Sequence, residues 1–300
     1  MLAATLAVIA LAISTDPIAN SSWNIGGGNY TTVRCGTIAH VPGLTKGAPY
    51  TASIFYPDGN GPFPVVSFAH GTGTAGVSLT LGYGTDLVTL AAYGFIVIGF
   101  DSCPLIECGA AFSIDQVAVL AAVKEHGGKL HPSLARADPT RTAVMGHSMG
   151  AMATLQSAIA STATKYNIKA AVAQHCCIDP TAGQPGSAEL VGVPFLLTAG
   201  GADVICPYEY TSLIYADLPN ALKRVVSWNA ATHYDPCGNG GMGRLLEVDS
   251  SARFLACAVR GEHCDGMPAF CKRAKADVCQ AGSDSRVGTG ANQFENITTV

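Results

Sequence analysis

From residue 50 onward, short runs of apolar and β-branched residues alternate with longer stretches of helical character. Residues 91–100 are almost continuously apolar, which is typical of a parallel strand buried on both faces. The alternation predicts a mostly parallel sheet flanked by helices. We expect strands at 50–57, 64–69, 91–100, 141–146, 168–174, 193–200 and 222–228, and helices at 113–127, 148–162, 207–217 and 242–258.

The composition limits the kinds of partner this chain can have. Of its 300 residues, 48% are hydrophobic and 13% are charged, with a net charge of -4, so the chain can bury a large core. We assign residues 25–260 to one domain. Because no basic run is present, we expect no nucleic-acid partner, and the sparse charge suits a neutral or apolar substrate. We expect a monomer.

Several features of the sequence predict export. Residues 1–14 form an apolar stretch that is too short to span a bilayer and resembles a signal peptide, so we expect secretion without stable membrane insertion. Eleven cysteines favour an oxidising compartment. Glycosylation sequons begin at Asn20, Asn29 and Asn296.

Beyond residue 257 the composition changes. Cysteines recur at 264, 271 and 279, and we interpret residues 261–280 as a cysteine-rich cap. Residues 281–300 show no hydrophobic period and are expected to be a flexible tail.

Residues 144–150 read VMGHSMG and contain the pattern Gly-x-Ser-x-Gly. The pattern alone is weak in a chain with 34 glycines. Its position between a predicted strand and a predicted helix matches a nucleophile elbow, in which the glycines permit a turn too tight for side chains. We therefore predict that Ser148 is a nucleophile at the carboxyl edge of the sheet.

A serine nucleophile needs a base and an acid that orients the base. Asp203 follows the predicted strand 193–200, and His233 follows the predicted strand 222–228. This matches the chain order serine, acid, histidine of the α/β-hydrolases. Asp179 and Asp235 are alternative acids, because one follows strand 168–174 and the other lies two residues from His233.

Acyl transfer also needs two N–H donors for the developing oxyanion. Met149 follows the nucleophile and would supply one backbone donor. The second is expected in the loop HGTG after strand 64–69, which resembles the oxyanion loop of lipases and esterases. We assign it to Thr72, with Gly71 as the nearest alternative.

Cysteines lie close to the predicted acid and base. Cys206 is three residues after Asp203, and Cys237 is four residues after His233. If the two loops meet at the active site, these thiols come close, so we predict a Cys206–Cys237 disulfide.

The segments FAHGTGTAG, LAAYGFIVIGFDS, AVMGHSMGAM, KAAVAQ, VPFLLTAGGADVICP and ATHYDPCG occur in the order found in the cutinase-like polyester hydrolases. This resemblance to the PET hydrolase-like branch of the dienelactone-hydrolase-type enzymes covers roughly residues 50–258. It implies an α/β-hydrolase fold without a lid domain, a triad of Ser148, Asp203 and His233, and no cofactor or metal. The disulfide proposed above resembles one that the PET hydrolase subgroup has at its active site.

Two positions depart from that family. Thr72 stands where an aromatic residue is usual, and Cys177 stands where a tryptophan is usual. We expect Cys177 and His147 to line the substrate cleft. The resemblance implies an ester or polyester substrate; a carboxylesterase, lipase or chlorophyllase-like esterase and an inactive binding protein are the alternatives.

Overall fold

The computed structural model describes residues 21–22, 28–45, 51–72, 79–102, 109–177, 188–219, 223–228, 231–237, 242–263 and 294–295. The strands of these residues are β1 (Ser21–Ser22), β2 (Thr32–Ile38), β3 (Ala52–Pro57), β4 (Phe63–Ala69), β5 (Ile96–Phe100), β6 (Ala137–His147), β7 (Ile168–Gln174), β8 (Phe195–Gly200), β9 (Lys223–Trp228) and β10 (Phe294–Glu295). They form one sheet in the order β1-β2-β3-β5-β4-β6-β7-β8-β9-β10. The pairs from β5 to β9 are parallel, and the outer pairs on both sides are antiparallel. This mixed sheet, flanked by helices, is an α/β-hydrolase fold.

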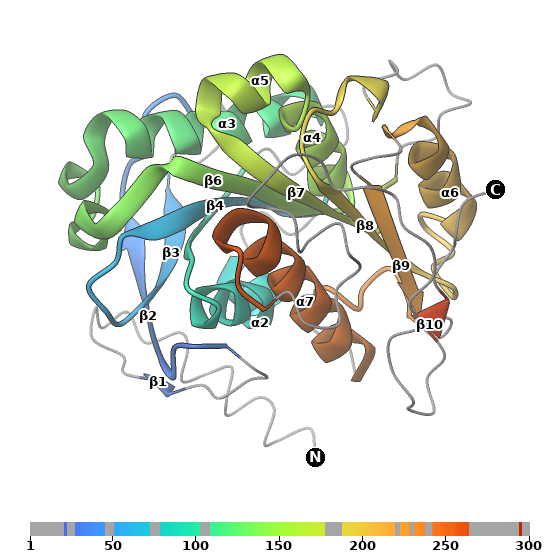
Figure 1. Ribbon diagram of the computed structural model, residues 1–300, viewed down its shortest axis with the longest axis horizontal. Coiled ribbons are helices and arrows are strands. Elements are labelled where there is room, and N and C mark those ends of the chain that lie inside the picture. Colours follow the sequence, from blue (N-terminus) through green and yellow to red (C-terminus); the bar gives the residue numbers. More distant parts are fainter. Residues whose placement is uncertain are drawn as a thin grey trace.

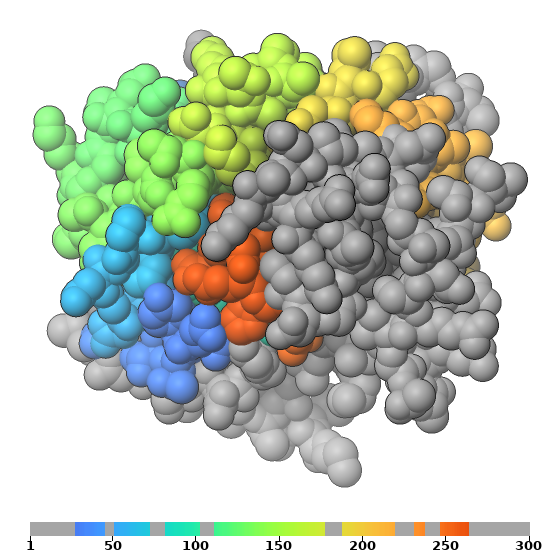
Figure 2. Space-filling view, viewed as in Figure 1, coloured from blue at the N-terminus to red at the C-terminus, as the bar shows by residue number. Residues whose placement is uncertain are grey.

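The helices lie on both faces of the sheet (Figure 1). They are α2 (Leu79–Ala92), α3 (Gly109–His126), α4 (Met149–Ser157), α5 (Ala160–Tyr166), α6 (Tyr208–Asp217) and α7 (Met242–Leu255). Helices α3, α4 and α5 cover one face, while α2 and α7 cover the other (Figure 1). Figure 2 shows α7 and the turn after it at the surface beside the N-terminal strands.

The central strands supply side chains to two separate cores. In β7, Ala171 and Ala173 pack in the core beneath α3 and α4, while Ala170 and Val172 pack in the core beneath α2 and α7. All four are fully buried. Successive residues of a strand point to opposite faces, so a strand buried on both faces must be apolar throughout. This explains the continuous apolar runs of the sequence.

Several predicted elements have different bounds in the structure; β6, for example, begins at Ala137 rather than at Arg141. The predicted strand 91–100 is the end of α2 followed by β5, because Gly94 adopts φ +89° and separates them. The predicted helix 148–162 is two helices, α4 and α5, because Ile159 is extended and forms a β-bridge with Val191. Helix α3 begins at Gly109 rather than near Ser113.

Some predicted features lie largely outside the described residues: the signal peptide at 1–14, the cysteine-rich cap beyond residue 263, and the sequons at Asn20 and Asn296. Asn29 is exposed, and its side-chain amide donates a hydrogen bond to Glu262. Within the predicted tail 281–300, the structure describes β10, which pairs with β9. None of the described helices is both long and apolar enough to cross a membrane.

Candidate active site

Ser148 occupies a strained turn between β6 and α4. It has φ 56° and ψ -116°, a conformation that L-residues rarely adopt and that occurs where the surrounding structure enforces it. A Cβ atom on Gly146 would lie 2.2 Å from the carbonyl oxygen of Gly150, and one on Gly150 would lie 2.1 Å from the carbonyl oxygen of Ala69. The motif glycines are therefore required by the close approach of β4, the turn and α4.

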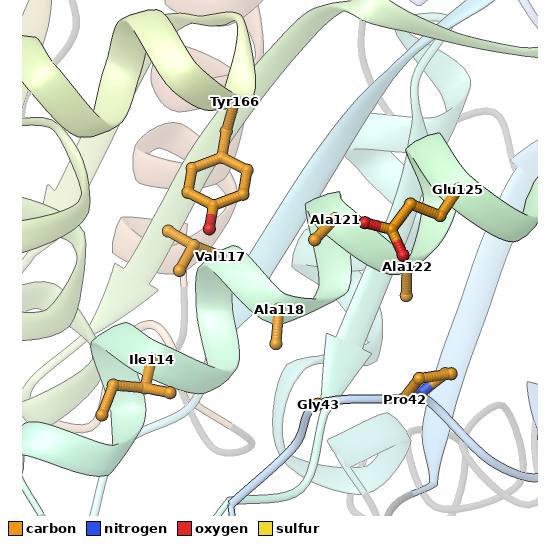
Figure 3. Close-up of a pocket in the computed structure, with 9 residues that line it drawn as sticks. All are labelled: Pro42, Gly43, Ile114, Val117, Ala118, Ala121, Ala122, Glu125 and Tyr166. Carbon is orange, nitrogen blue, oxygen red and sulfur yellow. The ribbon is translucent and has the colours of Figure 1, made fainter.

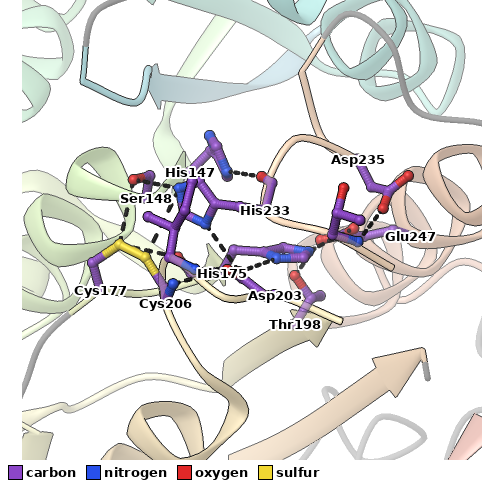
Figure 4. A network of polar contacts seen from close by, with 12 residues as sticks. His147, Ser148, His175, Cys177, Thr198, Asp203, Cys206, His233, Asp235 and Glu247 are labelled. Carbon is purple, nitrogen blue, oxygen red and sulfur yellow. Dashed lines mark hydrogen bonds and ion pairs between the residues drawn. A yellow bond between two sulfur atoms is a disulfide. The ribbon is translucent and has the colours of Figure 1, made fainter. Parts of the chain in front are cut away.

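The predicted base and acid lie in line with Ser148 (Figure 4). His233 Nε2 is 2.9 Å from Ser148 Oγ, and His233 Nδ1 is 2.9 Å from Asp203 Oδ2. When Nδ1–H donates to the carboxylate, Nε2 is free to accept the serine proton. Asp235 instead accepts a hydrogen bond from the Thr232 backbone N–H, and Asp179 lies outside the described residues.

Asp203 is held by four hydrogen bonds. Its Oδ2 accepts from His233 and, at 2.8 Å, from His175, while Oδ1 accepts from the backbone N–H groups of Ile205 at 2.9 Å and Cys206 at 2.8 Å. Burial raises the pKa of this carboxyl, but the bonds from the two imidazoles and the Cys206 amide outweigh burial, so the pKa lies well below its usual range. Asp203 is thus an ionised carboxylate fixed in orientation.

His175 was not anticipated from the sequence. Its side chain is fully buried, with Nδ1 on Asp203 and Nε2 3.2 Å from Glu247 Oε2. Thr198 donates its hydroxyl to the other oxygen of Glu247. His175 directly follows β7, at the carboxyl edge of the sheet, and this position in the sequence could have indicated a site residue. Glu247, in contrast, lies on α7 with no local sequence signal.

His147 does not line the substrate cleft, contrary to our prediction. It is buried, and it joins the oxyanion loop to the base loop: the Gly71 N–H donates to the Tyr83 hydroxyl, which lies 2.8 Å from His147 Nδ1, and His147 Nε2 lies 2.9 Å from the backbone oxygen of His233. Burial and then the neighbouring His233 and His175 hold the pKa of His147 well below its usual value. His147 is therefore a neutral structural link.

The predicted oxyanion donors, Thr72 and Met149, lie next to each other. The Thr72 hydroxyl is 3.7 Å from Met149 Sδ. Met149 is the first residue of α4, so its N–H has no partner within the helix. Gly71, the alternative donor, uses its N–H to bind the Tyr83 hydroxyl. The geometry thus favours Thr72 over Gly71.

The predicted Cys206–Cys237 disulfide is wrong, because Cys206 is bonded to Cys177. Their Cα atoms are 4.7 Å apart, since Cys177 follows β7 and Cys206 follows the neighbouring parallel strand β8. Cys177 Sγ lies 3.5 Å from Ser148 Oγ, so Cys177 contacts the predicted nucleophile. Cys206 Sγ lies 3.8 Å from His233 Nε2.

Among the described residues, two groups have the composition of metal ligands: one combines Cys177, Cys206 and His233, and the other His175, Asp203 and His233. The two sulfurs of the first are bonded to each other, so neither is a thiolate. The imidazoles of the second are hydrogen-bonded to carboxylates. Both groups include His233 and therefore overlap the hydrogen-bonded array of Ser148, His233 and Asp203.

A pocket lies elsewhere, along the outer side of α3 (Figure 3). Tyr166 precedes β7 and is therefore at the opposite end of the strands from Ser148. The pocket contains no member of the triad and is lined by Pro42, Gly43, Ile114, Val117, Ala118, Ala121, Ala122, Glu125 and Tyr166.

The mixed sheet with its flanking helices, and the positions of Ser148, Asp203 and His233 after β6, β8 and β9, define an α/β hydrolase. The chain belongs to the PET hydrolase-like family, whose profile matches residues 8–261. It is accordingly a hydrolase that acts on esters. No curated protein matches the chain.

Proposed function

We propose that this chain is a serine carboxylic ester hydrolase of the cutinase or polyesterase type, with Ser148 as nucleophile, His233 as base and Asp203 as the orienting acid. The observation that carries the proposal is the continuous hydrogen-bonded line from Ser148 Oγ through both nitrogens of His233 to Asp203, with 2.9 Å at each link. A serine, an imidazole and a carboxylate in this order are the components of acyl transfer.

The reaction takes two steps. Ser148 Oγ attacks the ester carbonyl while His233 Nε2 takes its proton, and the negative oxygen that forms is bound by the N–H groups of Met149 and Thr72. His233 then protonates the leaving alcohol, and the acyl-enzyme remains. Water, deprotonated by the same nitrogen, releases the acid and restores Ser148. Because neutral imidazole is the base, kcat/KM rises with pH across the acid limb.

The surface beside the triad suits an apolar ester. Val204, Ile205 and Tyr234 are large hydrophobic residues that are exposed, and each lies within two residues of Asp203 or His233. Exposed apolar groups next to a catalytic serine favour the hydrocarbon part of an ester over a charged substrate. The polyester is the favoured substrate, by analogy with the family.

Thr72 and Cys177 support a second candidate, a carboxylesterase, lipase or chlorophyllase-like esterase. Cys177 is tied into a disulfide beside Ser148, where the resembling enzymes have a tryptophan, and Thr72 replaces an aromatic residue. Without these rings, stacking on an aromatic diacid is weaker. The alcohol and acyl groups of the esters that the protein hydrolyses distinguish this candidate from the polyesterase.

A fluorophosphonate probe tests the chemistry. We expect it to label the wild type and not Ser148→Ala, whereas Ser157→Ala, a buried serine on α4, keeps the label. A folded wild type that resists labelling would support an inactive binding protein.

Hydrolysis of nitrophenyl esters of increasing chain length, compared with release from films of aliphatic and aromatic polyesters, tests the substrate class. Hydrolysis of soluble esters without release from any film would reject the polyesterase assignment.

We also propose that the protein is secreted, on the basis of the apolar residues 1–14, the eleven cysteines and the sequons, and that it is a monomer. The Cys177–Cys206 bond supports an oxidising compartment. Expression in a secreting host, followed by N-terminal sequencing and light scattering of the released protein, tests both statements. An uncleaved protein retained in the cell, or a stable dimer, would contradict them.

A further inference from the structure

Both ring nitrogens of the buried His175 face carboxylate oxygens. Nδ1 is 2.8 Å from Asp203 Oδ2 and Nε2 is 3.2 Å from Glu247 Oε2 (Figure 4). All three side chains have no exposed surface or almost none. A neutral imidazole carries one N–H and one lone pair. When both carboxyl groups are ionised, either neutral tautomer of His175 would therefore point a lone pair at an anionic oxygen.

The surroundings of His175 are built for this ring position. Its backbone has φ 48°, a left-handed conformation that is costly for a residue other than glycine. A Cβ on Gly200 would lie 2.9 Å from His175 Cε1, so the strand beside the ring needs a glycine. The strained backbone and the close approach of Gly200 indicate that the position of the imidazole is determined by the fold.

We propose that His175 is a buried imidazolium, held by Glu247, that acts as a positioning residue for Asp203 and thereby for His233. This inference rests on the proposed function only where it concerns His233 as the base. The cation donates to Asp203 Oδ2, the same oxygen that receives His233 Nδ1–H, so it restricts that carboxylate to one orientation. In an ordinary triad the line of hydrogen bonds ends at the acid. Here it continues from Asp203 through His175 to Glu247 on α7.

The groups that face His175 come from four places. Asp203 lies in the loop after β8, Glu247 on α7, His147 at the end of β6, and His233 in the loop after β9; the rings of His147 and His233 are each centred 6.0 Å from that of His175. Burial lowers the pKa of His175, but the charge of Glu247 and the hydrogen bonds to Asp203 and Glu247 outweigh it and raise the pKa to about 9. Two carboxylates and one imidazolium leave a single net negative charge.

This cation has a consequence for the base. A positive charge 6.0 Å from the ring of His233 opposes a second positive charge there. Glu247, on the far side of His175, offsets part of this repulsion. The imidazolium therefore extends activity toward lower pH than Asp203 alone would allow.

Nuclear magnetic resonance tests the charge without any turnover, so its outcome is independent of the proposed function. In protein labelled with ¹⁵N-histidine, the His175 ring is the one whose Hε1 proton contacts Gly200. We expect two protonated nitrogens on this ring at about pH 7.5, persisting toward its pKa of about 9. A single ring N–H at that pH would overturn the proposal.

Two variants test the roles of the pair. In Glu247→Gln, His175 loses its counter-charge, so the doubly protonated signal should disappear at lower pH than in the wild type; an unchanged titration would refute the role of Glu247.

In His175→Asn, the acid limb of kcat/KM should move to higher pH by about half to one unit. His126→Asn, at the exposed end of α3, is the matched control and should leave the profile in place. An unshifted profile in a folded His175→Asn would refute the effect on His233, and if this variant does not fold, the wild-type signal and Glu247→Gln decide.

Discussion

Replacing Cys177 and Cys206 together with alanine removes the covalent link between the loops that follow β7 and β8. These loops carry His175 and Asp203, and the Cys206 N–H is one of the four donors to the Asp203 carboxylate. The double substitution should therefore lower both stability and activity.

The size of the stability loss follows from the length of the loop that the bond closes. The two cysteines are 29 residues apart. The chain-entropy relation gives about 3.5 kcal/mol for a loop of this length, and for a domain of this size the loss lowers Tm by roughly 10 °C. Because a displaced Asp203 no longer orients His233, we expect kcat for a soluble ester to fall about tenfold or more.

Differential scanning calorimetry and ester hydrolysis measure the two effects. The matched control is Cys35→Ala, because Cys35 is a half-buried free thiol on β2, outside the site. A double variant that melts within about 2 °C of this control would refute the stabilising role of the bond. A fall in Tm with unchanged kcat would refute its role in positioning Asp203.

Three further predictions concern the triad and its turn. Asp203→Asn should keep the fold but lower kcat by about 10⁴-fold, since the His233 tautomer is lost; near-wild-type ester hydrolysis would contradict this. The folded pKa of His175, about 9, lies above its ordinary value of 6.5, so its stabilising effect is complete below pH 6.5 and disappears as pH rises through about 9. Denaturant unfolding should show about 3 kcal/mol of this loss in the wild type and none in His175→Asn; equal slopes would contradict it. Gly146→Ala should cost more than about 2 kcal/mol, whereas Gly82→Ala, which meets nothing within 4 Å, should not; equal melting temperatures would refute the close approach.

The three residues of the proposed triad could be predicted from the sequence because their positions follow from local pattern and chain order. Ser148, Asp203 and His233 each follow an apolar strand, and parallel strands bring their carboxyl ends to one edge. No knowledge of which strands are neighbours is needed for that inference. The structure accordingly brings these three side chains into contact.

The partners behind the triad depend on strand order and helix docking. Cys206 bonds Cys177 because β8 lies beside β7, a neighbour relation that spacing from Asp203 does not contain. Glu247 meets His175 across 72 residues, through the docking of α7. Helix α2 is not among the helices predicted from the sequence, because Gly82 and Gly84 lower its helix propensity. In the folded protein, packing against β3 and β5 outweighs this low propensity.

The position of Glu247 on α7 has a consequence for synthesis of the chain. The ribosome releases Ser148, His175 and Asp203 well before α7, so the buried imidazole and the core beneath α2 lack their last partner until the chain has reached about residue 255. Until then, the face of the sheet that α7 covers is exposed in the nascent chain, and His175 lacks the carboxylate of Glu247. Ester hydrolysis should therefore appear only after α7 has docked, which makes activity a reporter of complete folding rather than of sheet formation.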